Sequence, residues 1–548
     1  MPDYGLGSWP MRRARIDSAG LALRQGDRSR SYGELADRVE HLARAFVSLG
    51  VGYGDRVAYL GLNDLATFEA FFAATRIGAL FVPLNTRLTA AEIAYLLGDS
   101  QPSVLLYGPE HAEVVTAADP TAHGVRTVLP ISDPAQRYEG LIESATALPA
   151  VGSEVSLSDD ALILYTSGTT GQPKGAVLTH ENLTFNTMNQ LAHADVLSSD
   201  VALCICPLFH ATGLGQVTLP TLFKGGTVVV VPKFDAEQVL AAVDQLRINS
   251  FAAVPTMLQM LCEHPNFATT NLSSLRFAIY GGSMVIERVA RAWQQRGVSI
   301  LQGYGMTEAS PGVYMAPEAG AREHPVSIGS PHFFTDVSLD APGVDDSGQR
   351  PAEPGAMGEL LVRGPNVFRG YWNRPADTEL AFTNGWFRSG DVLRIGDDGW
   401  AYVVDRVKDM IISGGENVYP AEVESAITAL PGVLDCAVVA EKDERWGEVG
   451  HAFVILAVGA AASTEGGPIA WTQSSMRERL RDTLASFKIP RLIEFVDELP
   501  RTATGKVRKQ LLRNRISPAP GSPGPALTDL ATSDLAVSDS APSKEIQT

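Results

Sequence analysis

Short apolar strands alternate with capped helices through most of the chain, and this alternation limits the fold more than any other feature. Ser31 and Glu34 have the spacing of a capping box, and Thr89 with Glu92 repeats it further along. Behind the first box, apolar residues recur at helical steps over Leu35, Val39, Leu42, Phe46 and Leu49. A strand is expected from Arg56 to Leu62 and a helix from about Leu65 to Ile77. Alternation of this kind predicts βαβ units, parallel sheets and an α/β fold.

The domain organisation follows from length and from a change in texture. A chain of 548 residues is long enough for two or three domains. The sequence becomes turn-rich near Gly396–Gly399, and smaller strands and helices alternate after Asp405. We predict a large N-terminal domain of several α/β subdomains at 1–405 and a small C-terminal α+β domain at 406–516. The tail at 517–548 is rich in Ser, Pro, Ala and Asp and is predicted to be disordered.

Composition excludes several classes of partner. The formal net charge of −18 argues against non-specific binding to nucleic acid or to anionic membrane, although a cleft can still be locally positive. No apolar run approaches the ~18 residues that span a bilayer. Ile16-Asp17-Ser18 follows Arg12 and Arg13, where a signal peptide would need an apolar stretch. We therefore expect a cytoplasmic protein without stable membrane association.

The four cysteines are too few and too scattered for a disulfide framework or a structural zinc site. They are Cys204, Cys206, Cys262 and Cys436. Cys204 and Cys206 alternate within an apolar run, which predicts that both side chains point to one face of a strand. Buried thiols are the better interpretation.

The strongest local motif is the loop from Tyr165 to Gly175, which follows the apolar strand 161–164 and precedes a helix near His180. Its glycines and hydroxyls allow backbone N–H and side-chain O–H groups to converge on phosphate oxygens, and Lys174 adds a positive charge. The loop is not a Walker A motif, because Pro173 precedes the lysine. A flexible surface turn would be the ordinary alternative for a shorter glycine-rich stretch.

This loop resembles the phosphate-binding signature of the adenylate-forming superfamily, which includes acyl-CoA synthetases, luciferases and peptide-synthetase adenylation domains. Further motifs of that family follow in the same order, and the resemblance extends from the first helix to about Arg515. It implies a large N-terminal domain and a small mobile C-terminal domain, with an active site in the cleft between them. It assigns phosphate contacts to Thr166, Ser167, Gly168, Thr169, Thr170, Gly171 and Lys174.

The later motifs imply roles for other residues of this chain. Gly281, Gly282 and Ser283 resemble the adenine-side turn. Within Tyr304-Gly305-Met306-Thr307-Glu308, the family uses the threonine on the α-phosphate and the glutamate on Mg²⁺. Asp391 and Arg406 match the ribose contacts, Lys408 matches the hinge between the domains, and Lys506 matches the catalytic lysine.

The chemistry agrees with these roles. A carboxylate and the α-phosphate of ATP are both negative, so their reaction needs neutralised charge and alignment more than a strong base. Glu308 would supply a hard oxygen ligand for Mg²⁺, and Lys506 would reach both reacting groups. Taken alone, each of these residues would be an ordinary surface charge.

Coenzyme A is the expected acceptor. The segment from Ile412 to Pro420 resembles the loop that enters the active site of bacterial acyl-CoA synthetases once their small domain has rotated. Gly415 would line the pantetheine tunnel, and Asn417 lies in the same loop. A tight turn before the Pro420 helix is the structural alternative. A thiol with a pKa of about 8.5 needs no dedicated base to attack an acyl-adenylate.

The acid is less well determined. His210 resembles the gate found in family members with aromatic substrates, although it could also simply pack beside the pocket. The pocket should be lined by the stretches 210–213, 281–284 and 303–306, which suits either a medium-to-long fatty acid or a cinnamate-type acid. Three alternatives stay open: a carrier-protein thiol as acceptor, nitrite as the adenylated acid with an aromatic amine as acceptor, and a nucleotide-binding regulator. The last predicts damage to Lys506, Glu308 or Asp391, all of which are present.

Overall fold

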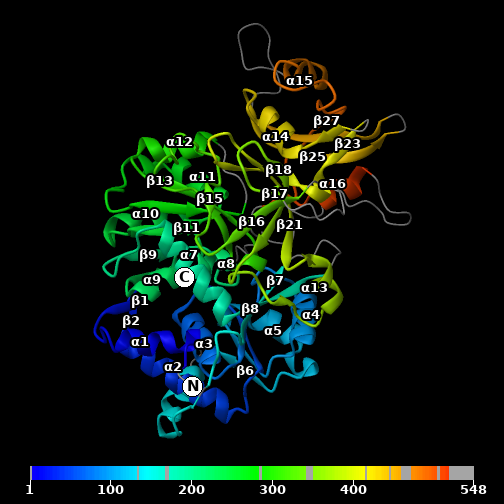
Figure 1. Ribbon diagram of the computed structural model, residues 1–548. Coiled ribbons are helices and arrows are strands. Elements are labelled where there is room, and N and C mark those ends of the chain that lie inside the picture. Colours follow the sequence, from blue (N-terminus) through cyan, green and yellow to red (C-terminus); the bar gives the residue numbers. More distant parts are fainter. Residues whose placement is uncertain are drawn as a thin grey trace, which may run out of the picture. The chain divides into compact units, whose positions relative to one another are not determined.

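A computed structural model describes most of the chain (Figure 1). The described residues are 3–132, 135–152, 154–166, 172–282, 287–340, 350–413, 416–443, 446–457, 471–502 and 506–516. They form two compact units, one ending at Val407 and the other beginning at Lys408. The tail predicted to be disordered, 517–548, lies outside the described residues.

A seven-stranded sheet in the N-terminal unit has the order β19-β8-β7-β4-β3-β5-β6. Its strands are β3 (Arg56–Leu60), β4 (Leu80–Pro83), β5 (Val104–Tyr107), β6 (Thr127–Pro130), β7 (Asp160–Thr166), β8 (Lys174–Thr179) and β19 (Gly370–Tyr371). Neighbouring strands from β6 to β7 are parallel, whereas β7–β8 and β8–β19 are antiparallel. The predicted parallel βαβ arrangement therefore holds for the inner strands.

Helices cover both faces of this sheet. They are α2 (Tyr32–Ser48), α3 (Leu65–Arg76), α4 (Ala90–Ser100), α5 (Ala112–Ala118) and α6 (Arg137–Ser144). Val57 and Tyr59 of β3 belong to the core that contains α2 and α3, whereas Ala58 and Leu60 belong to the core that contains α4 and α5. Alternate residues of one strand thus supply two hydrophobic cores.

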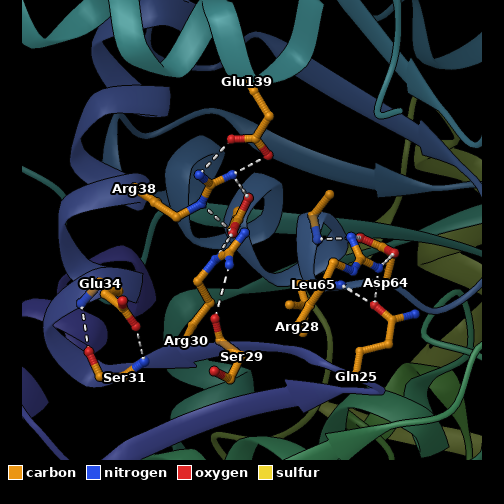
Figure 2. Close-up of polar contacts among 12 residues, drawn as sticks. Gln25, Arg28, Ser29, Arg30, Ser31, Glu34, Arg38, Asp64, Leu65 and Glu139 are labelled. Atoms are coloured by element: carbon orange, nitrogen blue, oxygen red, sulfur yellow. Dashed lines mark hydrogen bonds and ion pairs between the residues drawn. The ribbon is translucent and has the colours of Figure 1, made fainter. Parts of the chain in front are cut away.

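The helix starts agree with the sequence. Ser31 and Glu34 form a complete capping box at the start of α2, and Thr89 and Glu92 form another at α4 (the first is drawn in Figure 2). Each box satisfies backbone N–H groups that a helix start leaves without partners.

A nine-stranded sheet has the order β15-β14-β13-β12-β11-β9-β10-β1-β2. Its strands are β1 (Leu21–Gln25), β2 (Arg28–Ser31), β9 (Val201–Cys204), β10 (Thr227–Val230), β11 (Ser250–Ala253), β12 (Phe277–Tyr280), β13 (Ser299–Gly305), β14 (Gly312–Met315) and β15 (Ser330–Pro331). The six strands from β13 to β1 are parallel. One face packs on α10 (Ala236–Gln245), α11 (Pro255–Glu263) and α12 (Glu287–Gln295) through the core that contains Phe251 and Trp293 (Figure 1).

One prediction about this sheet is wrong. Cys204 ends β9 and belongs to the core shared with α2 and α3, whereas Cys206 belongs to the core shared with α10 to α12. The strand ends before Cys206, so strict alternation no longer sets the direction of its side chain. Cys204, Cys206 and Cys436 are buried as free thiols, and Cys262 is partly buried.

A smaller antiparallel sheet completes the N-terminal unit. Its order is β17-β16-β18-β21-β20, and β22 pairs with β21. The strands are β16 (Asp336–Asp340), β17 (Arg350–Pro351), β18 (Met357–Arg363), β20 (Phe382–Thr383), β21 (Trp386–Ile395) and β22 (Ala401–Arg406). The predicted turn at Gly396–Gly399 joins β21 to β22, and their register places Asp391 opposite Arg406.

The C-terminal unit is a small α+β domain. Its sheet has the order β24-β23-β26-β25, with β27 parallel to β26, and these strands are β23 (Ile411–Ser413), β24 (Glu416–Val418), β25 (Val433–Asp443), β26 (Gly447–Leu456) and β27 (Leu492–Phe495). The helices are α14 (Pro420–Thr428), α15 (Gln473–Leu480) and α16 (Lys509–Ile516). Val438 packs with α14 and α15, whereas Val439 packs with α16. Within the described part of the chain, no helix combines the length and apolar character needed to cross a bilayer.

Candidate active site

The glycine-rich loop joins two paired strands. β7 ends at Thr166 and β8 begins at Lys174, and these two residues lie opposite each other in the antiparallel register. The Thr166 hydroxyl also donates to the Lys174 carbonyl oxygen at 3.4 Å. Both ends of the loop are therefore held at one end of the hairpin. Ser167, Gly168, Thr169, Thr170 and Gly171 lie outside the described residues.

Lys174 and Glu308 both contact the side chain of Tyr371. The Lys174 ammonium forms an ion pair with Asp377 and lies 5.5 Å from the centroid of the Tyr371 ring. The Tyr371 hydroxyl donates to Glu308 Oε1 at 2.9 Å. Burial raises the pKa of Tyr371, and the Glu308 charge raises it further. Tyr371 therefore stays protonated at neutral pH and acts as a donor that orients the Glu308 carboxylate.

The surroundings of Glu308 suit a Mg²⁺ ion shared with a phosphate ligand better than a metal ion held by protein side chains alone. Mg²⁺ in proteins is usually bound through one or two carboxylates, waters and substrate phosphates. Among the described residues no group of three or more His, Cys, Asp or Glu side chains could hold a metal ion. A single oriented carboxylate at Glu308, after Thr307 in the same short 3-10 turn, fits an ion shared with ATP. When bound, magnesium would neutralise phosphate charge.

The two predicted ribose contacts form a cluster with Tyr304. Asp391 is 7% exposed, its Oδ1 lies 3.0 Å from Arg406 Nε, and its Oδ2 accepts a 2.7 Å hydrogen bond from the Tyr304 hydroxyl. Burial and the Asp391 charge raise the pKa of Tyr304, so its hydroxyl remains a donor. β13, β21 and β22 thus bring together three residues predicted from separate motifs.

Two stretches predicted for the acyl pocket lie side by side. Gly281 follows β12 and Gly303 belongs to the neighbouring strand β13. A Cβ on Gly281 would lie 2.9 Å from the Gly303 carbonyl oxygen, so the Gly303 backbone leaves no room for a side chain at position 281. Gly282 has a φ of +91°, a conformation that favours glycine. Ser283 and Met284 lie outside the described residues.

His210 lies immediately before the short helix α8 (Ala211–Gly215). Its backbone N–H donates to the Pro207 carbonyl oxygen at 3.1 Å, and its ring centroid lies 4.6 Å from that of Phe209. His210 is the N-cap residue and is itself extended, with φ −114° and ψ 145°, so the helical backbone begins at Ala211. Gln216, at the end of α8, contacts the Gly281 and Gly303 region.

The remaining predicted residues belong to the C-terminal unit. Lys408 lies in a 3-10 turn (Val407–Asp409) at the division between the units. Asn417 belongs to β24 and pairs with Ile412 of β23, and Gly415 lies outside the described residues. Lys506 is exposed, and its backbone exchanges hydrogen bonds with Thr502. These positions do not test the roles predicted for the four residues.

Sequence reasoning missed Tyr371, Asp377 and Gln216. Tyr371 lies 63 residues from Glu308, and Asp377 lies 203 residues from Lys174. Only the antiparallel pairing of β19 with β8 brings Tyr371 towards Lys174. Local spacing carries no signal for such contacts, although an aromatic residue in the turn-rich Gly370-Tyr371-Trp372 stretch could have been considered.

Known proteins similar to this chain share both its units. The family model described as "AMP-binding enzyme" matches residues 8–372, and "AMP-binding enzyme C-terminal domain" matches residues 422–506. A feruloyl-CoA synthase from an Amycolatopsis species is 47% identical, with 94% of this chain and 100% of that protein covered. An indoleacetate–CoA ligase from Aromatoleum aromaticum is 39% identical, with 93% and 98% covered.

A solved structure agrees in fold. The ATP-bound crystal structure of MatB from Rhodopseudomonas palustris superposes with a TM-score of 0.82 at 30% identity, covering 93% of this chain and 98% of that one. The family matches, the identities over nearly the whole chain and the shared fold lead to one conclusion. The chain belongs to the AMP-binding enzyme family.

Proposed function

We propose that this chain is a ligase for hydroxylated cinnamic acids of the ferulate type, which it joins to coenzyme A. The observation that carries the proposal is the 47% identity to a feruloyl-CoA synthase along nearly the whole of both chains. An identity of 39% to an indoleacetate–CoA ligase also favours a flat aromatic acid.

As a member of its family, the chain is an AMP-forming acid–thiol ligase that uses ATP, Mg²⁺ and coenzyme A. In the first half-reaction a carboxylate oxygen attacks the α-phosphorus of ATP, and the bond to pyrophosphate breaks. In the second, the coenzyme A sulfur attacks the acyl carbon of the adenylate, and AMP leaves. The thiol proton passes to solvent or phosphate, because an acyl-adenylate is reactive enough without a dedicated base.

We assign roles within this sequence of events by residue. Lys174, Thr307 and the loop 166–171 would hold the phosphates, while Asp391 and Arg406 would bind the ribose. Glu308 would hold Mg²⁺, and Lys506 would align the carboxylate with the α-phosphate. Geometry supports the assigned phosphate and ribose contacts. The Tyr371 ring lies beside the Lys174 ammonium and its hydroxyl donates to Glu308, while the Tyr304 hydroxyl donates to Asp391, which pairs with Arg406.

A fatty acid is the second candidate substrate, because a long-chain-fatty-acid–CoA ligase from Mycobacterium tuberculosis is 36% identical over 89% of this chain. A carrier-protein thiol as acceptor, and nitrite as the activated acid, are further outcomes that a suitable assay distinguishes.

Pyrophosphate release provides the test. The purified full chain with ATP and Mg²⁺ is supplied with ferulate, 4-coumarate, cinnamate, benzoate, decanoate or nitrite, with and without coenzyme A. We expect the highest kcat/KM with a hydroxycinnamate, and a thioester only when coenzyme A is present. Preference for decanoate or nitrite, or adenylation without a thioester, would refute the proposal while leaving the family assignment intact.

A further inference from the structure

Gln216 is a buried polar residue that the nucleotide chemistry does not use. We propose that its side-chain amide is a specificity determinant that binds the ring hydroxyl of a hydroxycinnamate substrate. The inference rests on the proposed function and adds the group that distinguishes a hydroxylated ring from an unsubstituted ring or an alkyl chain.

The amide oxygen of Gln216 is a buried acceptor. Gln216 is 5% exposed, and its Oε1 accepts no hydrogen bond from any of the described residues. The nearby buried amide of Asn186, by contrast, is satisfied: it donates to the Gly215 carbonyl at 2.9 Å and accepts from the Gly312 N–H at 3.1 Å. Leaving a buried acceptor without a donor costs about 1–3 kcal/mol, so a ligand that donates there is favoured.

The amide lies where the acid is expected. A Cβ on Gly303 would lie 3.0 Å from Gln216 Nε2, and a Cβ on Gly281 would lie 3.3 Å from the same atom. The Gln216 amide therefore lies against two of the three stretches predicted to line the acyl pocket. Gln216 itself follows the third stretch, through the helix that begins after His210.

Close packing fixes the position of this amide. A Cβ on Gly213 would lie 2.3 Å from the Pro207 carbonyl oxygen, and one on Gly215 would lie 2.8 Å from the Ser310 carbonyl oxygen. At both glycines the backbone of the short helix therefore packs directly against neighbouring backbone, with no side chain between. Gln216, which follows the helix, has little freedom to move as a result. A polar group held in this way suits a substrate of matching polarity.

The chemistry favours a phenol. A ring hydroxyl can donate its hydrogen to Gln216 Oε1, whereas cinnamate and a fatty acid carry only C–H groups at the corresponding end. A site built around such a hydrogen bond discriminates strongly against an analogue without the hydroxyl, because the buried polar group then stays unsatisfied.

The test compares 4-coumarate with cinnamate, which differ only by the hydroxyl. The readout is the ratio of their kcat/KM values for thioester formation by the full chain. In the unmodified protein the ratio should be about tenfold or more in favour of 4-coumarate. In a Gln216→Leu variant it should fall by about tenfold or more, chiefly through loss of activity with 4-coumarate.

Gln25→Leu is the matched control. Gln25 is also buried, at 9% exposure, but its amide donates to the Asn63 carbonyl and accepts from the Leu65 N–H. Its variant should keep the ratio of the unmodified protein. An unchanged ratio in Gln216→Leu, or an equal change in both variants, would overturn the inference.

The unmodified protein also tests the idea without any variant. Equal kcat/KM values for 4-coumarate and cinnamate would overturn the role of Gln216 even if Gln216→Leu failed to fold. Absence of any thioester from hydroxycinnamates would instead overturn the proposed function. The two failures are therefore distinguishable.

Discussion

At the scale of single residues, Glu69 shows how a buried charge is retained in the N-terminal unit. Its side chain is 1% exposed and meets Arg38 Nε at 2.6 Å, Arg30 Nε at 3.0 Å and the Tyr138 hydroxyl at 2.9 Å. Arg38 also donates to Glu139 (Figure 2). Burial alone would raise the pKa of Glu69, but the hydrogen bonds and charges of the two arginines outweigh it, so the pKa lies below its ordinary value of 4.5.

Glu69→Gln should therefore destabilise the N-terminal unit in a pH-dependent way. Near pH 7 we expect the free energy of unfolding to fall by about 3 kcal/mol, because two arginines lose a buried partner. A depressed folded-state pKa means that the stabilisation is complete above pH 4.5 and is lost as pH falls through the folded-state value. Urea unfolding from pH 7 downwards measures the difference, which should shrink with acidification.

Glu139→Gln is the control for this experiment. The Glu139 side chain is 41% exposed, so its loss should cost less than about 1 kcal/mol. A Glu69→Gln effect as small as this, or one that stays constant down to acid pH, would contradict the role of the ionised carboxylate.

Substitution of Asp391 is expected to affect the binding of ATP. Asp391→Asn weakens the pairing with Arg406 and the ability to accept hydrogen bonds, so KM for ATP should rise about tenfold with a smaller change in KM for the acid. Pyrophosphate-release kinetics at varied ATP provides the measurement. Asp397→Asn, in the exposed turn after β21, should behave like the unmodified protein. A larger change for the acid than for ATP would argue against a ribose contact.

At the scale of elements, the end of β13 depends on a glycine. A Cβ on Gly305 would lie 1.6 Å from the Pro311 carbonyl oxygen, which also accepts a hydrogen bond from the Met306 N–H at 2.9 Å. Backbone cannot yield as a flexible side chain does. Any larger residue would therefore displace the turn that follows, where Thr307 and Glu308 lie.

Gly305→Ala should accordingly lower the rate of acid-dependent pyrophosphate release by about 100-fold, because small misplacements of aligned groups carry large rate penalties. Gly140→Ala makes the same chemical change in α6, where nothing lies within 4 Å of the added carbon. It should leave the rate unchanged and slightly favour the helix. Similar rates for both variants would show that the β13 end tolerates a side chain.

At the scale of the whole molecule, the chain divides its predicted chemistry between two compact units. The clusters around Glu308 and Asp391 belong to the N-terminal unit, whereas Lys506 belongs to the C-terminal unit. Lys506 is expected to neutralise charge only while the negative carboxylate approaches the negative α-phosphate. Its loss should therefore slow adenylation and not thioester formation.

Lys506→Ala should lower adenylation by about 100-fold or more while thioester formation from supplied acyl-adenylate stays near its normal rate. Lys442→Ala removes another exposed lysine of the C-terminal unit and should affect neither step. Acid-dependent pyrophosphate release and thioester formation from synthetic adenylate separate the two rates. Equal losses in both steps would refute this division of labour.

Several features could be predicted because they depend on neighbours along the chain. Capping boxes at Ser31 and Thr89 need only a residue three positions on, and the turn at Gly396–Gly399 needs only its own glycines and aspartates. The motifs around Lys174, Glu308 and Asp391 can also be recognised from short stretches of sequence, because glycines, hydroxyl residues and charged residues are concentrated in them. The sequence by itself therefore determined the family, the two-unit layout and most of the candidate nucleotide contacts.

Other features depend on how distant strands pair, and only the tertiary structure decided them. Whether β8 runs antiparallel to β7, and which core receives Cys206, depend on where strands end and which neighbours they meet. Tyr371 reaches Glu308 because β19 pairs with β8, and Gln216 reaches Gly303 because α8 packs against bare backbone. Hydrogen bonds and close contacts join atoms in space irrespective of their separation in sequence, so local spacing cannot reveal them.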